Sequence, residues 1–364
     1  MRLRHRLSFL LLSIVFFAIT ANCAEPGLAG KSAQVDEILA PQFKENGPGA
    51  AVLVIQDGEK VYEKCFGIAA MKTMTPIRPH TVFELASCSK QFTAMAIMIL
   101  ADQNKLRYSD HLTKFFPEFQ GFGDGITVEH LLHHTGGLTD YMDAWSKAGE
   151  KGEPTSREMI HLLSRVKKVE FQPGQKYEYS NSGYMVLAQI VEKASGKKYP
   201  EFVKEHIFKR IGMNESLVFD ETRPQIEHPA HSFEFKGGEW KNIDRDPLNF
   251  IYGDGAVKTN LDDLYKWDQA LYTEKLVSHE TLEKAFTEGK LNDGSGTGYG
   301  FGWGVSRAHG SKCLDHEGAW LGFRTEIYRL PEHHFSVIML GNFASFHPGP
   351  LVGKIAAIYF SPKK

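Results

Sequence analysis

The chain has 364 residues, of which 42% are hydrophobic and 24% charged, a composition typical of a globular protein rather than a disordered one. Its formal net charge of −2 leaves no basic excess for a phosphate backbone, which argues against a nucleic-acid-binding protein. A chain of this length suggests about two domains or one large one.

The first residues are predicted to lie outside the fold. Three arginines within residues 2–6 precede the apolar stretch 7–19 and a group of small residues, a pattern typical of a secretory signal peptide over residues 1–23. A single transmembrane anchor is an alternative for this stretch, but it is shorter than the ~20 residues that span a bilayer. We therefore expect no membrane span in the mature chain and a secreted or periplasmic protein. The second interpretation is a lipoprotein anchored at Cys23, although the residues before it differ from the usual lipidation signal.

The N-terminal part of the mature chain is predicted to form a helix and a hairpin. The helix begins near Lys31 and ends at Pro41, because proline cannot continue a helix. A strand follows over residues 51–55. Asp57-Gly58 is a strong two-residue hairpin signal, which returns the chain through a second strand that ends near Phe66.

Ser87 and Lys90 form the first candidate catalytic pair. A serine and a lysine three residues apart lie on one helix face, and the apolar run 92–101 predicts that this helix is buried. Lys90 can accept the serine proton if burial disfavours its charged form, and free N–H groups at the helix start favour a developing oxyanion. On this motif alone, Ser87 as a helix cap and Lys90 as a solvated residue are the favoured interpretation, because the motif is short.

The middle of the chain, residues 102–294, is predicted to be helical and loop-like, without strand pairs. One helix is capped by Thr127, and another runs over residues 182–194 and stops at Gly196. A third begins at residue 259 or 260, with two acidic residues in its first turn.

Strand character returns late in the chain, before a closing helix over residues 351–360. Four short runs are rich in residues that favour β-structure: 299–305, 312–315, 323–330 and 335–340. Strands at both ends and helices between them predict one antiparallel sheet with an inserted helical domain. The sheet domain would comprise residues 24–86 and 296–364, and the mainly helical domain residues 87–295.

Two further motifs carry polar groups suited to catalysis. Tyr179-Ser180-Asn181 precedes a predicted helix, where a tyrosine beside a cation can relay a proton and an asparagine can bind an amide or ester. The later run 315–319 contains His316, Glu317, Gly318 and Ala319: a polar side chain, a glycine that permits close approach, and a backbone N–H at a strand edge.

Taken in this order, the motifs resemble those of the serine β-lactamase and penicillin-binding-protein superfamily. The resemblance is strongest to its branch of class C β-lactamases, D-alanyl-D-alanine carboxypeptidases, family VIII esterases and D-aminopeptidases. Ser87-x-x-Lys90 matches the first motif, Tyr179-Ser180-Asn181 the second, and His316-Glu317-Gly318 the third. The segment 131–138, Leu-Leu-His-His-Thr-Gly-Gly-Leu, resembles a further family segment, with Gly136 where serine is usual. The resemblance runs from about residue 47 to residue 342.

The resemblance implies an α/β fold of the β-lactamase and transpeptidase type: an antiparallel sheet flanked by helices, with an all-helical insert. It also implies roles for the site residues. Ser87 would form an acyl-enzyme, Lys90 and Tyr179 would move the proton, and the N–H groups of Ser87 and Ala319 would form the oxyanion hole. Asn181 and the third motif would orient the substrate, with no metal or other cofactor.

The function expected from this resemblance is a serine hydrolase, of esterase or peptidase type, that acts on a small molecule or peptide with an ester or amide carbonyl. The alternatives are a D-alanyl-D-alanine carboxypeptidase or β-lactamase, and a non-catalytic binding or assembly protein. Glu317 replaces the usual hydroxyl residue of the third motif. If its side chain lines the cleft, it would repel a substrate carboxylate; otherwise it faces solvent or pairs with Arg324.

A metallohydrolase is the remaining alternative. Glu129, His130, His133 and His134 have a spacing that could present metal ligands from one helix, but the sequence contains no His-Glu-x-x-His motif. Cys65, Cys88 and Cys313 are too widely spaced to indicate a zinc site or a disulfide framework.

Overall fold

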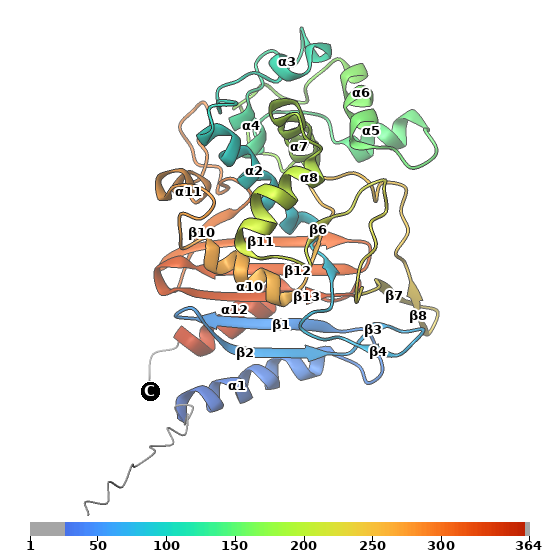
Figure 1. The fold of residues 1–364 in the computed structure, drawn as a ribbon, viewed down its shortest axis with the longest axis vertical. Coiled ribbons are helices and arrows are strands. Elements are labelled where there is room, and N and C mark those ends of the chain that lie inside the picture. The colour runs from blue at the N-terminus through green and yellow to red at the C-terminus, as the bar shows by residue number, and fades with distance from the viewer. Residues whose placement is uncertain (1–25, 361–364) are drawn as a thin grey trace, which may run out of the picture.

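A six-stranded antiparallel sheet forms the centre of the computed structural model, which describes residues 26–360 (Figure 1). Its strand order is β10-β11-β12-β13-β1-β2. The strands are β1 (Ala50–Gln56), β2 (Glu59–Phe66), β10 (Gly304–Ala308), β11 (Ser311–Trp320), β12 (Phe323–Leu330) and β13 (Phe335–Gly341). Because β1 pairs with both β2 and β13, it joins the two ends of the chain. The predicted fold class is therefore confirmed.

The hairpin between β1 and β2 has the predicted turn. Asp57 and Gly58 both have positive φ angles, 54° and 82°, as a two-residue turn between antiparallel strands requires. The β1 strand is buried on both faces of the sheet, which explains why its sequence, Ala-Ala-Val-Leu-Val-Ile-Gln, shows no polar alternation before its last residue.

Each face of the sheet packs against helices. The face that we call the back face is covered by α1 (Pro26–Leu39) and α12 (Pro348–Phe360), which bury Val52 and Val337. The opposite face, here the front face, packs against α10 (Leu261–Ala270) and the short 3₁₀ helix η2 (Ala86–Ser89). Leu53 and Ile327 lie in this front core. Strand residues alternate between the two faces, so a strand side chain reaches either η2 or α12 but not both.

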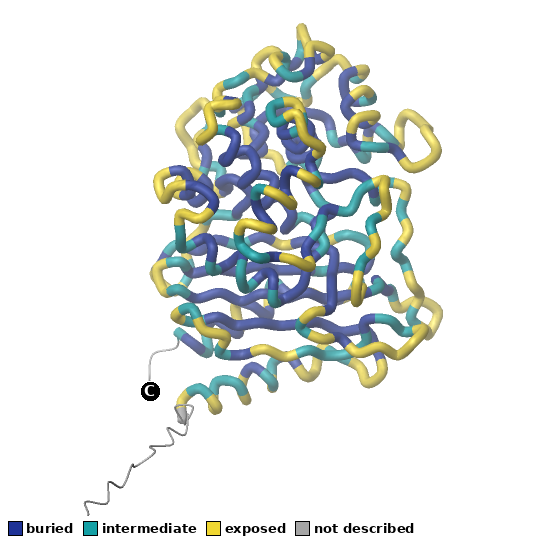
Figure 2. The backbone as a smooth tube through the Cα atoms, in the orientation of Figure 1, coloured by how far each residue is buried: buried dark blue, intermediate teal, exposed yellow. Residues whose placement is uncertain are grey.

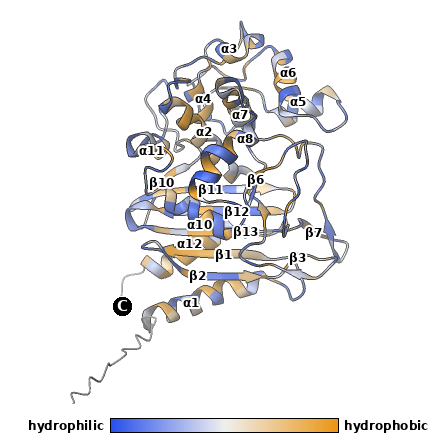
Figure 3. Ribbon diagram, viewed as in Figure 1, coloured by the Kyte–Doolittle hydropathy of each residue, from blue (hydrophilic) through white to orange (hydrophobic). Residues whose placement is uncertain are grey.

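The other helices gather at the far side of η2, in the upper half of Figure 1. Helix α2 (Lys90–Asp102) lies at their centre, and every residue from Lys90 to Leu100 is buried, as its apolar sequence predicts (Figures 2 and 3). The surrounding helices are α3 (Leu112–Phe115), α4 (Val128–Leu132), α5 (Tyr141–Ala148), α6 (Ser156–Val166), α7 (Asn181–Ser195), α8 (Tyr199–Val203), α9 (Lys209–Ile211) and α11 (His279–Ala285).

The predicted ends of three helices are confirmed. Thr127 caps α4 with its side chain, Gly196 ends α7 in the left-handed conformation with φ 73°, and Asn260 caps α10. Helix α12 begins at Pro348 rather than at residue 351. Two prolines within the first turn remove N–H groups that no helix carbonyl would have accepted, so they do not delay its start.

The expectation that residues 102–294 contain no strand pairs is wrong. This range contributes β6 (Leu217–Val218), β7 (Phe233–Lys236), β8 (Glu239–Asn242) and β9 (Val257–Thr259), while β3 (Ile68–Ala70), β4 (Thr75–Pro76) and β5 (Phe83–Glu84) precede it. Strands of two to four residues are too short to show a period. The sequence nevertheless contains a hairpin signal between β7 and β8, the pair Gly237-Gly238. Both glycines have the positive φ angles that a two-residue turn requires.

The prediction that a strand begins at residue 299 is also wrong, because β10 begins only at Gly304. The preceding glycines pack against the helical part of the chain. A Cβ atom on Gly302 would lie 2.8 Å from the backbone oxygen of Lys90, and one on Gly300 would lie 2.0 Å from that of Ala285. The glycines therefore permit close contact with the start of α2 rather than strand pairing.

The predicted signal peptide, residues 1–23, and the alternative anchor at Cys23 lie outside the described residues. Within residues 26–360, no helix is long and apolar enough to cross a membrane, and the three cysteines are free. The domain boundaries near residues 86 and 295 stay predictions.

Candidate active site

Ser87 lies in a strained turn that is attached to the sheet. The preceding residue, Ala86, has a φ of 48°, a left-handed conformation that is unfavourable for a residue with a Cβ atom. Two hydrogen bonds hold the turn: Thr325 Oγ1 donates to the Leu85 carbonyl at 2.7 Å, and Cys88 Sγ donates to the His316 carbonyl at 3.0 Å. The first and third motifs are therefore in direct contact.

Gly318 makes this contact possible. A Cβ atom at this position would lie 2.2 Å from both the Leu85 backbone oxygen and Thr325 Oγ1. Neither atom has room to move away, because the two are hydrogen-bonded to each other. Only glycine lets β11 approach the nucleophile turn this closely.

Lys90 lies at the start of α2 with its side chain fully buried. Its ammonium nitrogen Nζ is 3.2 Å from Ser87 Oγ, 2.9 Å from Asn181 Oδ1 and 2.9 Å from the backbone oxygen of Asp254. An ammonium group has three N–H donors, so all of them are used within the protein. The predicted nucleophile and its predicted proton acceptor are thus within hydrogen-bond distance.

The second motif reaches the same point from α7. Ser180 caps this helix by accepting a hydrogen bond from the Gly183 N–H, which places Asn181 on its first turn. The ring centroid of Tyr179 is 4.8 Å from Lys90 Nζ, and this tyrosine is 40% exposed. The structure therefore brings together Ser87, Lys90, Tyr179 and Asn181 as the sequence predicts.

His134 supports the second motif, a contact that the sequence did not predict. Its Nδ1 accepts the Ser180 N–H at 3.0 Å, and its ring centroid is 4.4 Å from that of Tyr179. Burial, with the nearby charge of Lys90, places the pKa of His134 well below its usual value, so the ring is neutral. The sequence signal for this supporting role of His134 is the segment 131–138, which resembles a segment of the superfamily. The spacing of His130, His133 and His134 suggested a metal site instead.

The three histidines of the metal alternative each have a separate partner. His130 completes the cap of α4 with Thr127, and His133 Nδ1 lies 2.9 Å from the Tyr299 carbonyl. Within residues 26–360, no group of three or more His, Cys, Asp or Glu side chains is arranged to hold a metal ion.

His316 is on the front face, close to the other motifs, but both of its ring nitrogens have partners within the protein. Nδ1 lies 2.7 Å from the Glu317 carbonyl, which only accepts, so Nδ1 carries the proton. Nε2 then accepts from the hydroxyl of Tyr299 at 2.8 Å. Burial and the nearby Lys90 lower the pKa of His316 to about 3, so it is neutral at physiological pH.

The expectation that Glu317 lines the cleft requires correction. Successive strand residues point to opposite faces, and Glu317 therefore faces the back of the sheet while His316 and Gly318 face the front. Its carboxylate lies at the start of α12, where a Cβ atom on Gly349 would be 2.4 Å from Oε1. Arg324, the alternative partner, instead donates to the carbonyls of Leu321 and Phe323. Glu317 thus has no contact with the front of the sheet.

On the back face, Glu317 pairs across the strands with Glu326, which is only 2% exposed. Burial, together with the charges of Asp315 and Glu317, raises the pKa of Glu326 from 4.5 to about 9. The folded chain therefore keeps a proton that the unfolded chain releases above about pH 4.5. The stability that this group contributes at low pH is lost as the pH rises toward about 9.

The variant Glu326→Gln should remove this pH dependence, because glutamine keeps the shape and has no proton to lose. We expect its free energy of unfolding to exceed that of the wild type at about pH 8 by a few kcal/mol, since each pKa unit corresponds to roughly 1.4 kcal/mol. The excess should vanish near about pH 4.5. Denaturant unfolding across this pH range measures it. Parallel curves for the two proteins would show that Glu326 is ionised in the folded state.

A pocket of about 210 Å³ opens beside Ser87. It is lined by residues from β5, η2, α5, α7 and β11 and from the loop before β9: Glu84, Ala86, Ser87, Tyr141, Met142, Asn181, Leu248, Asn249, Ile251, Asp254, Gly255, Ala256, Ala319 and Trp320. It therefore contains the predicted nucleophile and the predicted oxyanion-hole residue Ala319.

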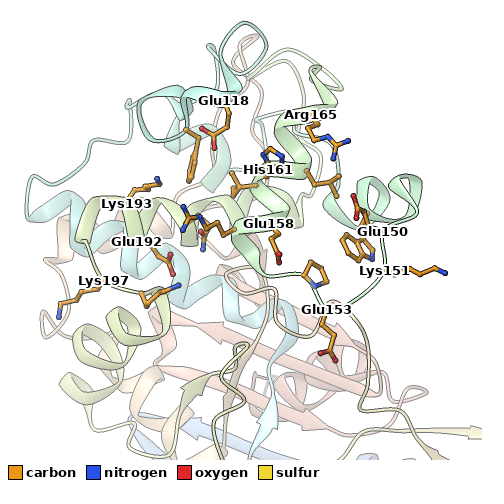
Figure 4. Close-up of a pocket in the computed structure, with 18 of the residues that line it drawn as sticks. Glu118, Glu150, Lys151, Glu153, Glu158, His161, Arg165, Glu192, Lys193 and Lys197 are labelled. Atoms are coloured by element: carbon orange, nitrogen blue, oxygen red, sulfur yellow. The ribbon is translucent and has the colours of Figure 1, made fainter.

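A larger cavity, of about 1070 Å³, lies between α6 and α7, where charged side chains such as Glu158, Glu192 and Arg165 surround it (Figure 4). None of the predicted site residues lines it, so the substrate site is assigned to the smaller pocket.

Comparison with known proteins identifies the family. The β-lactamase family model matches residues 33–357. The chain belongs to the β-lactamase family. Members of this family are serine hydrolases, and this β-lactamase family protein is a serine hydrolase acting on an ester or amide.

The relatives of this β-lactamase family protein include different hydrolases. It is 34% identical over 321 residues to penicillin-binding protein 4* of Bacillus subtilis (strain 168), which covers 84% of the chain and 70% of the relative. It is 27% identical to a D-aminopeptidase of Gluconobacter oxydans (strain 621H) over 82% of the chain, but spans only 56% of that enzyme. The aminopeptidase thus extends well beyond the shared part.

Solved structures support the same fold. The octameric penicillin-binding protein homologue from Pyrococcus abyssi matches with a TM-score of 0.79 and 28% identity, covering 91% of this chain and 77% of that one. A class C β-lactamase matches with a TM-score of 0.77 over 94% of this chain and 99% of its own; at 20% identity, this match shows the fold alone.

Proposed function

We propose that Ser87 is the nucleophile of this hydrolase and forms an acyl-enzyme with an ester or amide substrate. The observation that carries the proposal is the 3.2 Å contact between Lys90 Nζ and Ser87 Oγ, with the Tyr179 ring beside the same nitrogen. A serine nucleophile needs a neighbouring group that accepts its proton, and we assign this role to Lys90 in its neutral form together with Tyr179.

In the proposed reaction, Ser87 Oγ bonds to the carbonyl carbon of the substrate, and its proton passes through Tyr179 and Lys90 to the leaving group. The bond to the leaving group breaks, and the acyl group stays on Ser87. Water then attacks the acyl carbon, the bond between this carbon and Ser87 Oγ breaks to release the acid, and the proton of the water returns to Ser87 Oγ through the same residues. The N–H groups of Ser87 and Ala319 form the oxyanion hole, in which each donor contributes on the order of 3 kcal/mol.

The substrate remains open between an ester, a peptide and a β-lactam. Glu317 faces the back of the sheet, so it does not repel a substrate carboxylate at Ser87. Penicillin-binding proteins and D-aminopeptidases are both among the relatives. We propose a secreted esterase or peptidase, with D-alanyl-D-alanine carboxypeptidase and β-lactamase activity as alternatives to be assayed beside it.

A fluorophosphonate probe tests whether Ser87 is the nucleophile. The wild-type protein should be labelled on the peptide that contains Ser87, and Ser87→Ala should not be labelled. The neighbouring Ser89→Ala variant is the matched control and should keep the label. Folded wild-type protein without any label would instead support a non-catalytic binding or assembly protein.

The variant Tyr179→Phe tests the proton relay. Phenylalanine keeps the ring beside Lys90 and removes only the hydroxyl, so we expect kcat to fall by about 100-fold or more while KM changes little. Tyr177→Phe removes a hydroxyl from an equally exposed tyrosine two residues away and should change kcat by less than about 3-fold. Equal activity in the two variants, measured with p-nitrophenyl butyrate, would exclude Tyr179 from the relay.

A further inference from the structure

The pocket beside Ser87 has a wall that joins the sheet to a loop. Trp320 lies at the end of β11, Asn249 lies in the loop before β9, and both line the pocket. The indole Nε1 of Trp320 donates a hydrogen bond to Asn249 Oδ1 at 2.8 Å. We propose that these two side chains, here the Trp320–Asn249 wall, determine how large an acyl group the enzyme accepts. The inference rests on the proposed role of Ser87 as the nucleophile.

The acyl group, and not the leaving group, is the part of the substrate that enters this pocket. In the proposed reaction, Tyr179 and Lys90 pass the proton to the leaving group, and neither residue lines the pocket. Ser87 and Ala319, which form the proposed oxyanion hole, do line it. A substrate bound at Ser87 therefore has its leaving group towards Tyr179 and its acyl group in the pocket.

The space for this acyl group is small and partly apolar. The pocket has a volume of about 210 Å³, whereas sites for whole small molecules usually have about 300–1,000 Å³. Met142, Leu248 and Ile251 supply apolar side chains to its lining. An acyl chain that extends from Ser87 therefore contacts hydrocarbon until it reaches the Trp320–Asn249 wall.

Asn249 is fixed, because both ends of its side-chain amide are bound. The indole of Trp320 can only donate and the Asp244 carbonyl can only accept, so Oδ1 faces the indole and Nδ2 donates to that carbonyl at 2.8 Å. The carboxylate of Asp244 is held in turn by the Ser232 N–H and by His231 Nδ1, each at 2.6 Å. The wall is thus attached to a loop that is itself hydrogen-bonded in place.

A fixed wall makes the dependence on acyl length steep. In a hydrophobic pocket, one methylene group too many costs about 10- to 200-fold in kcat/KM. We expect kcat/KM of p-nitrophenyl esters to rise with acyl length from acetate, and to fall by at least about 10-fold once the chain reaches the wall. Rates that rise smoothly as far as decanoate would show that the pocket is not closed and would overturn the proposal.

Two isomeric esters separate the acyl side from the leaving-group side. Octyl butanoate and butyl octanoate have the same formula, but the long chain is the leaving group in the first and the acyl group in the second. We expect kcat/KM for octyl butanoate to exceed that for butyl octanoate by at least about 10-fold. Equal rates, or faster hydrolysis of butyl octanoate, would contradict the placement of the acyl group and overturn the proposal.

Variants of the two wall residues test their role directly. Asn249→Ala opens the far end of the pocket and should raise the ratio of kcat/KM for p-nitrophenyl octanoate to that for the butyrate by at least about 10-fold. Trp320→Phe removes the indole N–H and should raise the ratio by a smaller factor. In the double variant the effects should not multiply, because both changes remove the same hydrogen bond.

Asn214→Ala and Trp240→Phe are the matched controls. Both exchange the same residue types outside the pocket, at an exposed turn and on β8, and should keep the wild-type ratio. A general loss of folded protein lowers both rates equally, so the ratio reports on the pocket. An unchanged ratio in Asn249→Ala, or effects that multiply in the double variant, would overturn the proposal.

A binding measurement keeps this test separate from the proposed chemistry. In the Ser87→Ala background, adding Asn249→Ala should strengthen the binding of octanamide relative to butanamide by at least about 10-fold, measured by calorimetry. Failure of this gain contradicts the size limit even if the fluorophosphonate probe labels Ser87. Missing labelling together with the expected gain would instead contradict the role of Ser87 and leave Trp320 and Asn249 as the wall of the pocket.

Discussion

Replacing Lys90 with methionine is expected to reduce the rate of acylation of Ser87 by roughly 100- to 10,000-fold, the range for the loss of a positioned acid or base. Methionine has a similar length and fills the buried space, but it offers no proton and no donor to Ser87 Oγ. The burst of p-nitrophenol from p-nitrophenyl butyrate, followed in a stopped-flow instrument, measures this step.

Lys193→Met is the matched control for this variant. Lys193 lies on α7 over the ring of Phe116, away from the pocket beside Ser87, so the same exchange should leave the burst rate within about 3-fold of the wild type. A Lys90→Met protein that acylates at the wild-type rate would show that Tyr179 or water suffices as the proton acceptor.

Gly318→Ala is expected to have the largest combined effect on stability and activity. The added Cβ atom would lie 2.2 Å from the Leu85 backbone oxygen, so β11 must move away from the turn that carries Ser87. Overpacking of this kind costs about 1–3 kcal/mol, and backbone atoms that cannot swing aside place this site at the upper end. Because the movement also displaces the Ala319 N–H from Ser87, acylation should fall by at least about 100-fold.

Gly353→Ala provides the contrast. Gly353 lies on the exposed side of α12, where a Cβ atom would meet nothing within 4 Å, so alanine should stabilise the helix by about 0.5–1 kcal/mol. Thermal unfolding should therefore show a lower Tm for Gly318→Ala and a slightly higher Tm for Gly353→Ala. The rate of p-nitrophenyl butyrate hydrolysis should fall in Gly318→Ala and stay unchanged in Gly353→Ala. A Gly318→Ala enzyme with wild-type stability would mean that the nucleophile turn is not fixed to the sheet.

The elements that carry the three motifs were predictable because each has a strong local signal. The apolar run after Lys90 predicts a buried helix, and Gly196 and Asn260 mark helix ends with residues suited to those positions. The joining of both chain ends in one sheet follows from strands at the two ends of the sequence and from the family resemblance. The convergence of Ser87, Lys90, Tyr179 and Asn181 was predicted from the family resemblance and not from these local signals.

The contacts around the motifs were not predictable, because they depend on pairing between distant segments. The face to which Glu317 points is fixed by the register between β11 and β12, and adjacent polar residues in the run 315–317 give no alternation from which to infer it. Tyr299 and His134 both reach the site from loops. The run that contains Tyr299 was predicted to be a strand, and the spacing of His134 and its neighbouring histidines suggested a metal site. Asp254 lies in a Gly-Asp-Gly segment, a sequence that predicts a turn and no catalytic role.

The most direct test of the account is the mass of the protein during turnover. After p-nitrophenyl butyrate is added and the reaction is quenched with acid, we expect a mass increase of one butyryl group, located by peptide mapping on Ser87 and missing in Ser87→Ala. A butyryl group on another residue, or hydrolysis that continues in Ser87→Ala at the wild-type rate, would contradict the assignment of Ser87 as the nucleophile.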